Sequence, residues 1–201
     1  SRRILNPYYT LFVALPGKNK DGHQYISDAY IKGVRSFIVE DIRAELFPDA
    51  TFIKVDDVLK ALQTFAKIHR NQFEIPIIGI TGSNGKTIVK EWLYQLLSPE
   101  YDVCRSPKSY NSQIGVPLSL LQLEAHHNIG IFEAGISTIH EMDSLEKMIQ
   151  PTIGIFTNIG PAHDACFENY ESKIDEKLKL FKNSSKLIYC ADYELIASRI
   201  P

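Results

Sequence analysis

The chain has 201 residues, a formal net charge of −2 and 44% hydrophobic residues. Its length suits one large domain or two small ones, and its mixed charges argue against a nucleic-acid-binding surface. The three Cys residues lie far apart, which favours reduced thiols in a cytoplasmic protein over a disulfide framework. No segment has the roughly 20 apolar residues that a membrane-spanning helix needs.

The first part of the chain reads as a small α/β domain. A helix over 26–32 should stop at Gly33, and Asp56 or Asp57 should cap a second helix that ends near Asn71. Three short apolar runs predict strands, at residues 10–14, 36–40 and 51–55. We read residues 15–24 as a loop and place a domain boundary near Glu74, which gives domains 1–74 and 75–201.

The second part alternates strands with helices, which predicts a mostly parallel sheet covered on both faces. The predicted strands span 77–81, 102–105, 129–133, 152–157 and 186–190, and the predicted helices span 85–97, 117–123, 141–149, 170–182 and 193–198. In such sheets, ligands bind at the carboxyl ends of the strands. We expect the helix over 85–97 to bury six apolar side chains, namely Ile88, Val89, Trp92, Leu93, Leu96 and Leu97.

A glycine loop, Thr-Gly-Ser-Asn-Gly-Lys-Thr, joins the strand over 77–81 to that helix. Gly82 and Gly85 allow a turn whose N–H groups, with the positive end of the helix, favour a phosphate. Lys86 would reach the phosphates, and the Thr87 hydroxyl would bind Mg²⁺. The loop fails the strict phosphate-loop pattern because Ile80 stands where that pattern has its first glycine. An ordinary Gly-Asn turn is the simpler alternative, but it explains neither the Lys nor the Thr.

Polar residues follow two further strands. Glu133 ends the strand over 129–133, where a carboxylate suits a hard cation such as Mg²⁺. Asn158 and His163 follow the strand over 152–157, in a position to bind a metal ion or a phosphate. The alternatives are a solvated strand end and a surface histidine. Periodicity alone selects none of the lysines in the helix over 170–182.

These motifs together resemble the Mur ligases, the ATP-dependent amide-forming enzymes of peptidoglycan synthesis. TGSNGKT matches the loop TGxxGKT of that family, which accounts for Ile80. The resemblance covers nearly the whole chain, through SRRI with LFVALPGKNKDGHQYI, then YNSQIGVPLSLL, EAGIS and TNIGPAHDACF. It implies a small α/β domain that holds the UDP end of the precursor, with Ser1 and Arg2 as expected contacts, followed by a phosphate-loop ATPase domain that is incomplete here.

The resemblance also implies the site residues. ATP would lie against Thr81, Gly82, Ser83, Asn84, Gly85, Lys86, Thr87, Asn111 and Asn158. Mg²⁺ would be held by Thr87, Glu133, His163 and Lys177, the last carbamylated. The catalytic residues would be Lys86, Glu133, His163 and Lys177.

Within the family the chain looks most like the MurF branch, which adds D-alanyl-D-alanine to UDP-N-acetylmuramoyl-tripeptide through an acyl phosphate. Ala162 and the IGVPL segment favour MurF over MurE. Three departures weaken that assignment: Ile88, Asp164-Ala165 and Lys179 replace the usual residues. The sequence also resembles the MurF half of fusion proteins with alanine racemase. We expect a monomeric cytoplasmic enzyme that serves cell-wall biogenesis, cell shape and cell division, and a fragment that is inactive without its C-terminal domain.

Three other readings stay open. One is a ligase of the same type with another substrate, MurE-like or folylpolyglutamate-synthase-like. Another is a phosphate-loop NTPase that drives a switch or transport, and the third is a non-catalytic nucleotide-binding module. The second predicts a strand that ends in Asp after the loop, whereas the best candidate strand ends in Glu133.

Overall fold

The computed structural model describes residues 6–17, 20–41, 46–160, 167 and 169–200. By its contacts the chain divides into two compact units, residues 1–62 and 63–201. This division falls inside α2 (Val58–Arg70), earlier than the boundary predicted near Glu74. The reason is that the second half of α2 packs on the larger unit, where Ala66 is fully buried in the main core.

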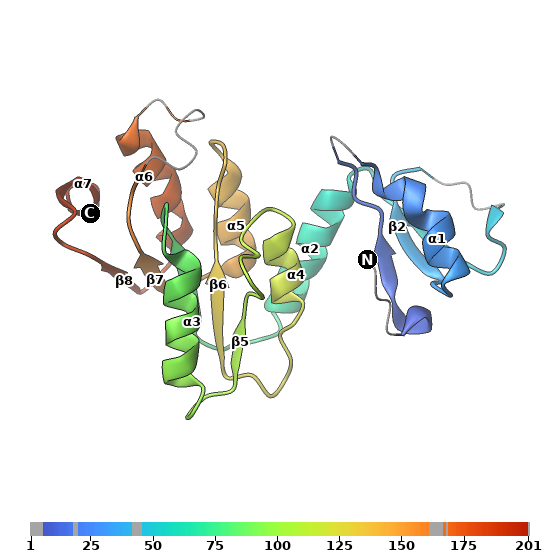
Figure 1. Ribbon diagram of the computed structural model, residues 1–201, viewed down its shortest axis with the longest axis horizontal. Helices are drawn as coiled ribbons and strands as arrows, with labels where there is room; N and C mark the ends of the chain where they lie inside the picture. Colours follow the sequence, from blue (N-terminus) through green and yellow to red (C-terminus); the bar gives the residue numbers. More distant parts are fainter. Residues whose placement is uncertain (1–5, 18–19, 42–45, 161–166, 168, 201) are drawn as a thin grey trace. The chain divides into compact units, whose positions relative to one another are not determined.

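The smaller unit is a three-stranded parallel sheet in the order β1-β2-β3 (Figure 1). Its elements are η1 (Pro7–Tyr9), β1 (Leu11–Val13), η2 (Gly22–Tyr25), α1 (Ile26–Ile31), β2 (Ser36–Val39) and β3 (Thr51–Lys54). Phe37 of β2 is fully buried and stacks on Phe52 with ring centroids 5.0 Å apart. Gly33 ends the α1 region in the left-handed conformation (φ +95°), as its position in the sequence predicted.

The predicted loop over 15–24 contains a short helix that the sequence reading missed. The Asp21 carboxylate accepts the His23 N–H at 3.0 Å, so the Asp-Gly turn becomes the N-cap of η2. The His23 ring also hydrogen-bonds to Asp21 at 2.7 Å, and its other ring nitrogen accepts the Glu40 N–H at 3.0 Å. His23 therefore ties this turn to the end of β2.

The larger unit contains a five-stranded parallel sheet in the order β5-β6-β4-β7-β8. The strands are β4 (Ile77–Thr81), β5 (Val103–Arg105), β6 (Ile129–Glu133), β7 (Ile153–Phe156) and β8 (Lys186–Tyr189). The central strand β4 is buried throughout, as expected for a strand covered on both faces. Its end, Ile80-Thr81, lies in register with Glu133 of β6 and Phe156 of β7. The predicted fold class, α/β with a mostly parallel sheet, is confirmed.

Helices cover both faces of this sheet (Figure 1). One face carries the main core, to which α4, α5 and α6 contribute, and the other packs against α3. The bounds are α3 (Lys86–Leu97), α4 (Gly115–Leu120), α5 (Glu141–Ile149), α6 (Tyr170–Leu178), η5 (Lys179–Phe181) and α7 (Glu194–Ala197). No described helix is long and apolar enough to cross a membrane.

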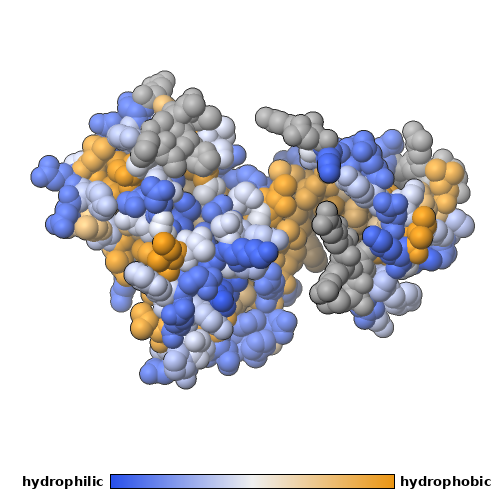
Figure 2. Space-filling view, viewed as in Figure 1, coloured by the Kyte–Doolittle hydropathy of each residue, from blue (hydrophilic) through white to orange (hydrophobic). Residues whose placement is uncertain are grey.

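The predicted burial of α3 is wrong for half of its apolar residues. Val89, Leu93 and Leu97 pack against the sheet core. Ile88, Trp92 and Leu96 instead keep 57%, 63% and 75% of their surface exposed. Figure 2 shows hydrophobic residues at the surface where α3 runs in Figure 1. The reason is geometric: a helix contacts a sheet through one stripe of side chains. Ile88, Trp92 and Leu96, spaced four residues apart, form a second stripe on the side of the helix, away from the sheet.

Candidate nucleotide and metal site

The glycine loop lies between β4 and α3, at the carboxyl edge of the sheet. Gly82 has a φ of +146°, and a Cβ there would lie 2.0 Å from the Thr157 hydroxyl oxygen. Gly85 has a φ of +80° as the N-cap of α3, and a Cβ there would meet nothing within 4 Å. Gly82 is thus required by close packing and Gly85 by its backbone angle, and the space beside Gly85 is open at the start of a helix.

The segment after β7 holds this loop in place. The Ser83 N–H donates to the Asn158 carbonyl, and the Asn84 N–H to the Asn158 side-chain oxygen, both at 2.9 Å. The Thr157 hydroxyl donates to the Asn84 carbonyl at 2.6 Å. Two of the loop N–H groups that the sequence suggested for phosphate are therefore directed at Asn158. Asn158 supports the loop, and its predicted contact with ATP stays a prediction.

Two lysines converge on the carbonyl of Gly82. Lys86 Nζ donates to it at 2.8 Å, and Lys177 Nζ, from α6, donates to it at 3.2 Å. Burial lowers the pKa of Lys86, partly offset by the charge of Glu133. Burial, followed by repulsion from Lys86 and Lys173, lowers the pKa of Lys177 to about 7. A substantial share of Lys177 is therefore an uncharged amine at neutral pH.

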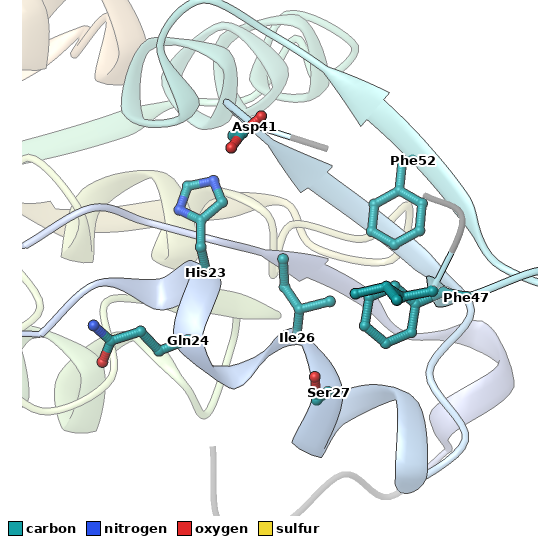
Figure 3. A pocket seen from close by; sticks show the side chains of 8 residues that line it. His23, Gln24, Ile26, Ser27, Asp41, Phe47 and Phe52 are labelled. Atoms are coloured by element: carbon teal, nitrogen blue, oxygen red, sulfur yellow. The ribbon is translucent and has the colours of Figure 1, made fainter. Parts of the chain in front are cut away.

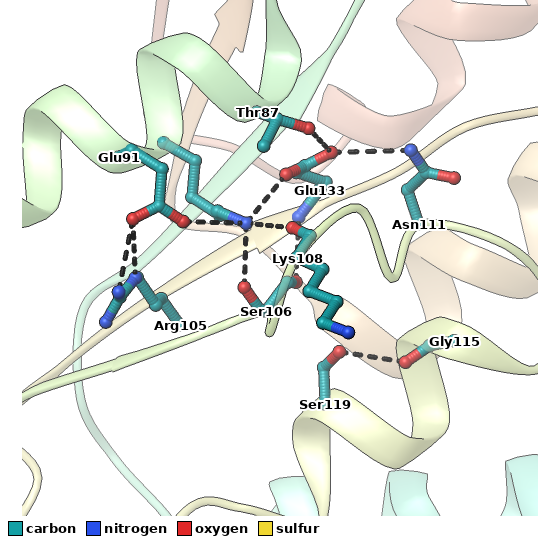
Figure 4. A network of polar contacts seen from close by, with 10 residues as sticks. Thr87, Glu91, Arg105, Ser106, Lys108, Asn111, Gly115, Ser119 and Glu133 are labelled. Carbon is teal, nitrogen blue, oxygen red and sulfur yellow. Dashed lines mark hydrogen bonds and ion pairs between the residues drawn. The ribbon is translucent and has the colours of Figure 1, made fainter.

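Glu133 lies at the end of β6 and is fully buried. Its Oε2 accepts hydrogen bonds from the Thr87 hydroxyl at 3.1 Å and from the Asn111 amide at 3.3 Å (Figure 4). Its Oε1 lies 2.9 Å from the amino group of Lys90, but no described donor has hydrogen-bond geometry toward it. Lys90 and Glu133 therefore form a buried ion pair without a directed hydrogen bond.

This donor set fits a hard cation. The Oε2 atom of the buried Glu133 lies 3.1 Å from the Thr87 hydroxyl, so two oxygen ligands of the kind that a hard cation prefers stand side by side next to the glycine loop. A cavity of about 100 Å³ adjoins the loop and is lined by Lys86, Asn111 and Lys177, among others. The same cavity is lined by Ser112, Gly135 and Ser137, which the sequence reading did not single out.

The remaining predicted residues divide into two groups. Thr81 is fully buried, and its hydroxyl donates to the Ala134 carbonyl at 2.8 Å, so it links β4 to the end of β6. Ser1, Arg2 and His163 lie outside the described residues. The structure thus brings Lys86, Thr87, Glu133, Asn111 and Lys177 to one edge of the sheet.

The smaller unit has a cavity of its own, of about 370 Å³ (Figure 3). His23 and Asp41 line one part of it, and Phe47 and Phe52 line another. Beside the cavity, hydrogen bonds from His23 lower the pKa of Asp21, whose side chain is not part of the cavity wall. The cavity thus combines aromatic walls with polar groups that can fix an orientation.

Residues 80–200 match the family model of the Mur ligase middle domain. The UDP-N-acetylmuramoyl-tripeptide–D-alanyl-D-alanine ligase of Bacillus subtilis is 32% identical over 191 residues, which are 94% of this chain and 42% of that protein. The ligase of the same name from Treponema pallidum is 34% identical over 208 residues, covering 95% of this chain and 44% of that protein.

Among solved structures, the MurF ligase of Thermotoga maritima in complex with ADP has a TM-score of 0.85 and 28% identity. It covers 98% of this chain, which matches 47% of that structure. The chain thus spans less than half the length of these relatives. The chain belongs to the Mur ligase family, and the relatives to which it is similar here are MurF ligases.

Proposed function

We propose that the chain forms part of an ATP-dependent ligase that adds D-alanyl-D-alanine to UDP-N-acetylmuramoyl-tripeptide. The observation that carries the proposal is the placement of Thr87, Glu133 and Lys177 beside one glycine loop. A nucleotide switch needs the loop and a metal carboxylate. A buried lysine with a pKa near neutrality, facing the same loop, is what a carbamate-forming ligase needs.

The peptide carboxylate of the precursor would attack the γ-phosphate of ATP, with ADP as leaving group, to form an acyl phosphate. The amine of D-alanyl-D-alanine would then displace phosphate and form the amide. Lys86 supports the first step, since its amino group, now on the Gly82 and Ser83 carbonyls, can turn to a phosphate oxygen. Its positive charge would stabilise the negative charge on the transferred group.

The residues that would hold Mg²⁺ are Thr87, Glu133, His163 and carbamylated Lys177. When bound, Mg²⁺ neutralises phosphate charge and orients the transferring oxygens. Lys177 supports this role: its uncharged amine would attack CO₂, form a C–N bond and release one proton, which leaves a carbamate anion. Starting from the ammonium cation, two protons are released in all. The low pKa of Lys177 makes that amine available near neutral pH.

The smaller unit would hold the UDP end of the precursor. The cavity that Phe47, Phe52, His23 and Asp41 line supports this, because aromatic walls suit a nucleobase and the polar groups suit a sugar. Ser1 and Arg2 remain proposed contacts. We further propose that the complete enzyme works as a monomer in the cytoplasm, in peptidoglycan synthesis.

The test is ADP release by the full-length protein with UDP-N-acetylmuramoyl-tripeptide and D-alanyl-D-alanine. Lys86→Ala should reduce it by at least about a hundredfold, whereas Lys60→Ala, at an exposed position of α2, should leave it unchanged. Near-normal ADP release by Lys86→Ala would refute the role of the loop. Dependence on L-glutamate and a folate, in place of the cell-wall substrates, would refute the substrate assignment.

A further inference from the structure

Lys90 is a buried cation that the proposed reaction leaves without a role. It lies on α3, and its side chain is fully buried. Its amino group is 2.9 Å from Glu133 Oε1 and 3.2 Å from Glu91 Oε1. It also donates to the Ser106 carbonyl at 2.8 Å and to the Lys108 carbonyl. Figure 4 labels these four partners, which come from α3, the end of β6 and the turn after β5.

The two carboxylate oxygens of Glu133 have different partners. Lys90 lies at Oε1, whereas Thr87 and Asn111 lie at Oε2. The Glu133 N–H donates to the Ser106 hydroxyl at 3.2 Å, and the Ser106 carbonyl accepts from Lys90. Lys90 and Ser106 together therefore fix both the backbone and the carboxylate of Glu133, with Oε2 directed toward the glycine loop.

The same amino group fixes the segment that leads to Asn111. Lys108 has a φ of +49°, a left-handed conformation that a residue with a side chain adopts at a cost. Its carbonyl and that of Ser106 both accept from Lys90. One charged group thus orders the acid at the end of β6 and the turn that leads to Asn111, which is one of the two neighbours of Oε2.

We propose that Lys90 is a positioning residue for the metal-binding carboxylate: it anchors Glu133 Oε1 so that Oε2 is presented to the cation. This inference rests on the proposed function, in which Glu133 holds Mg²⁺. Partners that orient a metal ligand typically affect metal affinity by about 10–100-fold. A purely structural lysine would affect folding stability alone.

Arg70 provides the matched control. It too is a buried cation that donates to backbone carbonyls, those of Phe73 at 2.7 Å and Ile149 at 3.1 Å. Ile149 ends α5 before β7 starts, so these contacts lie at the opposite, amino edge of the sheet. Within the part of the chain that the structure describes, Arg70 donates to carbonyl oxygens and pairs with no carboxylate. Arg70→Met should therefore lower stability without changing metal binding.

The experiment uses the full-length protein, wild type, Lys90→Met and Arg70→Met, each with saturating ADP. Binding of Mn²⁺ is measured from the loss of its free-ion electron paramagnetic resonance signal, and thermal unfolding reports folding. We expect Lys90→Met to weaken Mn²⁺ binding by about 10–100-fold and to raise the KM for Mg²⁺ more than it lowers kcat at saturating Mg²⁺. Arg70→Met should bind Mn²⁺ as the wild type does.

The outcomes separate the inference from the proposed function. Equal Mn²⁺ affinity of folded Lys90→Met and wild type would overturn the role of Lys90 while leaving the metal site intact. A wild type that binds no Mn²⁺ with ADP would overturn both. If Lys90→Met does not fold, Lys90→Gln keeps a donor for the Ser106 carbonyl without the charge, and the same weakening is expected of it.

Discussion

The two edges of the five-stranded sheet each bury a cation among backbone carbonyls, but they use it differently. At the amino edge Arg70 donates to the carbonyls of Phe73 and Ile149 and closes the end of α5. At the carboxyl edge Lys90 donates to carbonyls and also faces Glu133. The comparison teaches that burial of a charge alone does not indicate chemistry. A buried carboxylate next to a glycine loop does indicate chemistry, because a bound ligand can replace the side chains that contact the carboxylate.

The largest expected effect comes from comparing two glycines, one in the middle of β4 and one just after it, at the carboxyl edge of the sheet. Gly82→Ala would place a Cβ 2.0 Å from the Thr157 hydroxyl oxygen in a backbone conformation that alanine rarely adopts. Gly79→Ala, in the middle of β4, the strand that precedes Gly82, would meet Pro151 Cβ at 2.8 Å. We expect Gly82→Ala to weaken ADP binding by at least about a hundredfold, since the loop must move, and Gly79→Ala to lower stability with ADP affinity retained.

Isothermal titration calorimetry with ADP measures the affinity of both variants, and urea unfolding measures their stability. Gly85→Ala is the intermediate case: its φ of +80° strains an alanine, but the space around it is open. An ADP affinity of Gly82→Ala within a few-fold of wild type would show that the loop does not bind the nucleotide in the conformation described here.

The second prediction concerns pH and Lys177. Its pKa is about 7 in the folded protein, against an ordinary value of 10.5, chiefly because it is buried. Between these two values the unfolded chain holds a proton that the folded protein has lost, so stability rises with pH there. Below about pH 7 both states are protonated, and this contribution no longer changes. The rise is at most about 1.4 kcal/mol per pH unit.

Lys177→Met should flatten this slope in urea unfolding between about pH 7 and about pH 9 in metal-free buffer. Arg70→Met should keep the slope, since burial lowers the pKa of Arg70 but arginine stays charged over that range. Parallel stability curves for Lys177→Met and wild type would contradict the lowered pKa. They would also remove the support that it gives to carbamate formation.

Much of the larger unit was predictable from its sequence. The bounds of β4, β6 and α5 agree with the predicted ranges 77–81, 129–133 and 141–149. Continuous apolar runs fix the buried strands, and a stripe of apolar residues fixes α5. The same patterns predict the loop, Lys86 and Glu133, because side chains that follow parallel strands meet at one edge.

What the sequence could not indicate depends on contacts between distant segments. From the sequence, Lys90 looks like a solvent-facing lysine. Its hydrogen-bond acceptors, the carbonyls of Ser106 and Lys108, lie in a turn far along the chain, so no local pattern predicts its burial. The exposure of Trp92 was missed because periodicity gives a hydrophobic stripe without saying how much of it the sheet covers. One clue was available: Lys90 follows Lys86 by one helical turn, on the side of α3 that faces the site.

The smallest expected effect compares the two ends of α5. His140, its N-cap at the carboxyl edge, has a φ of +72°, and Gln150, its C-cap at the amino edge, has a φ of +48°. Glycine adopts this conformation without strain, so His140→Gly should raise the free energy of unfolding by about 0.5–1 kcal/mol. Gln150→Gly should gain less, because the Gln150 amide donates to the Lys147 carbonyl at 3.3 Å and that contact would be lost. Urea unfolding of both variants tests the order. A larger gain for Gln150→Gly would mean that strain, rather than the side-chain contact, dominates at the amino edge.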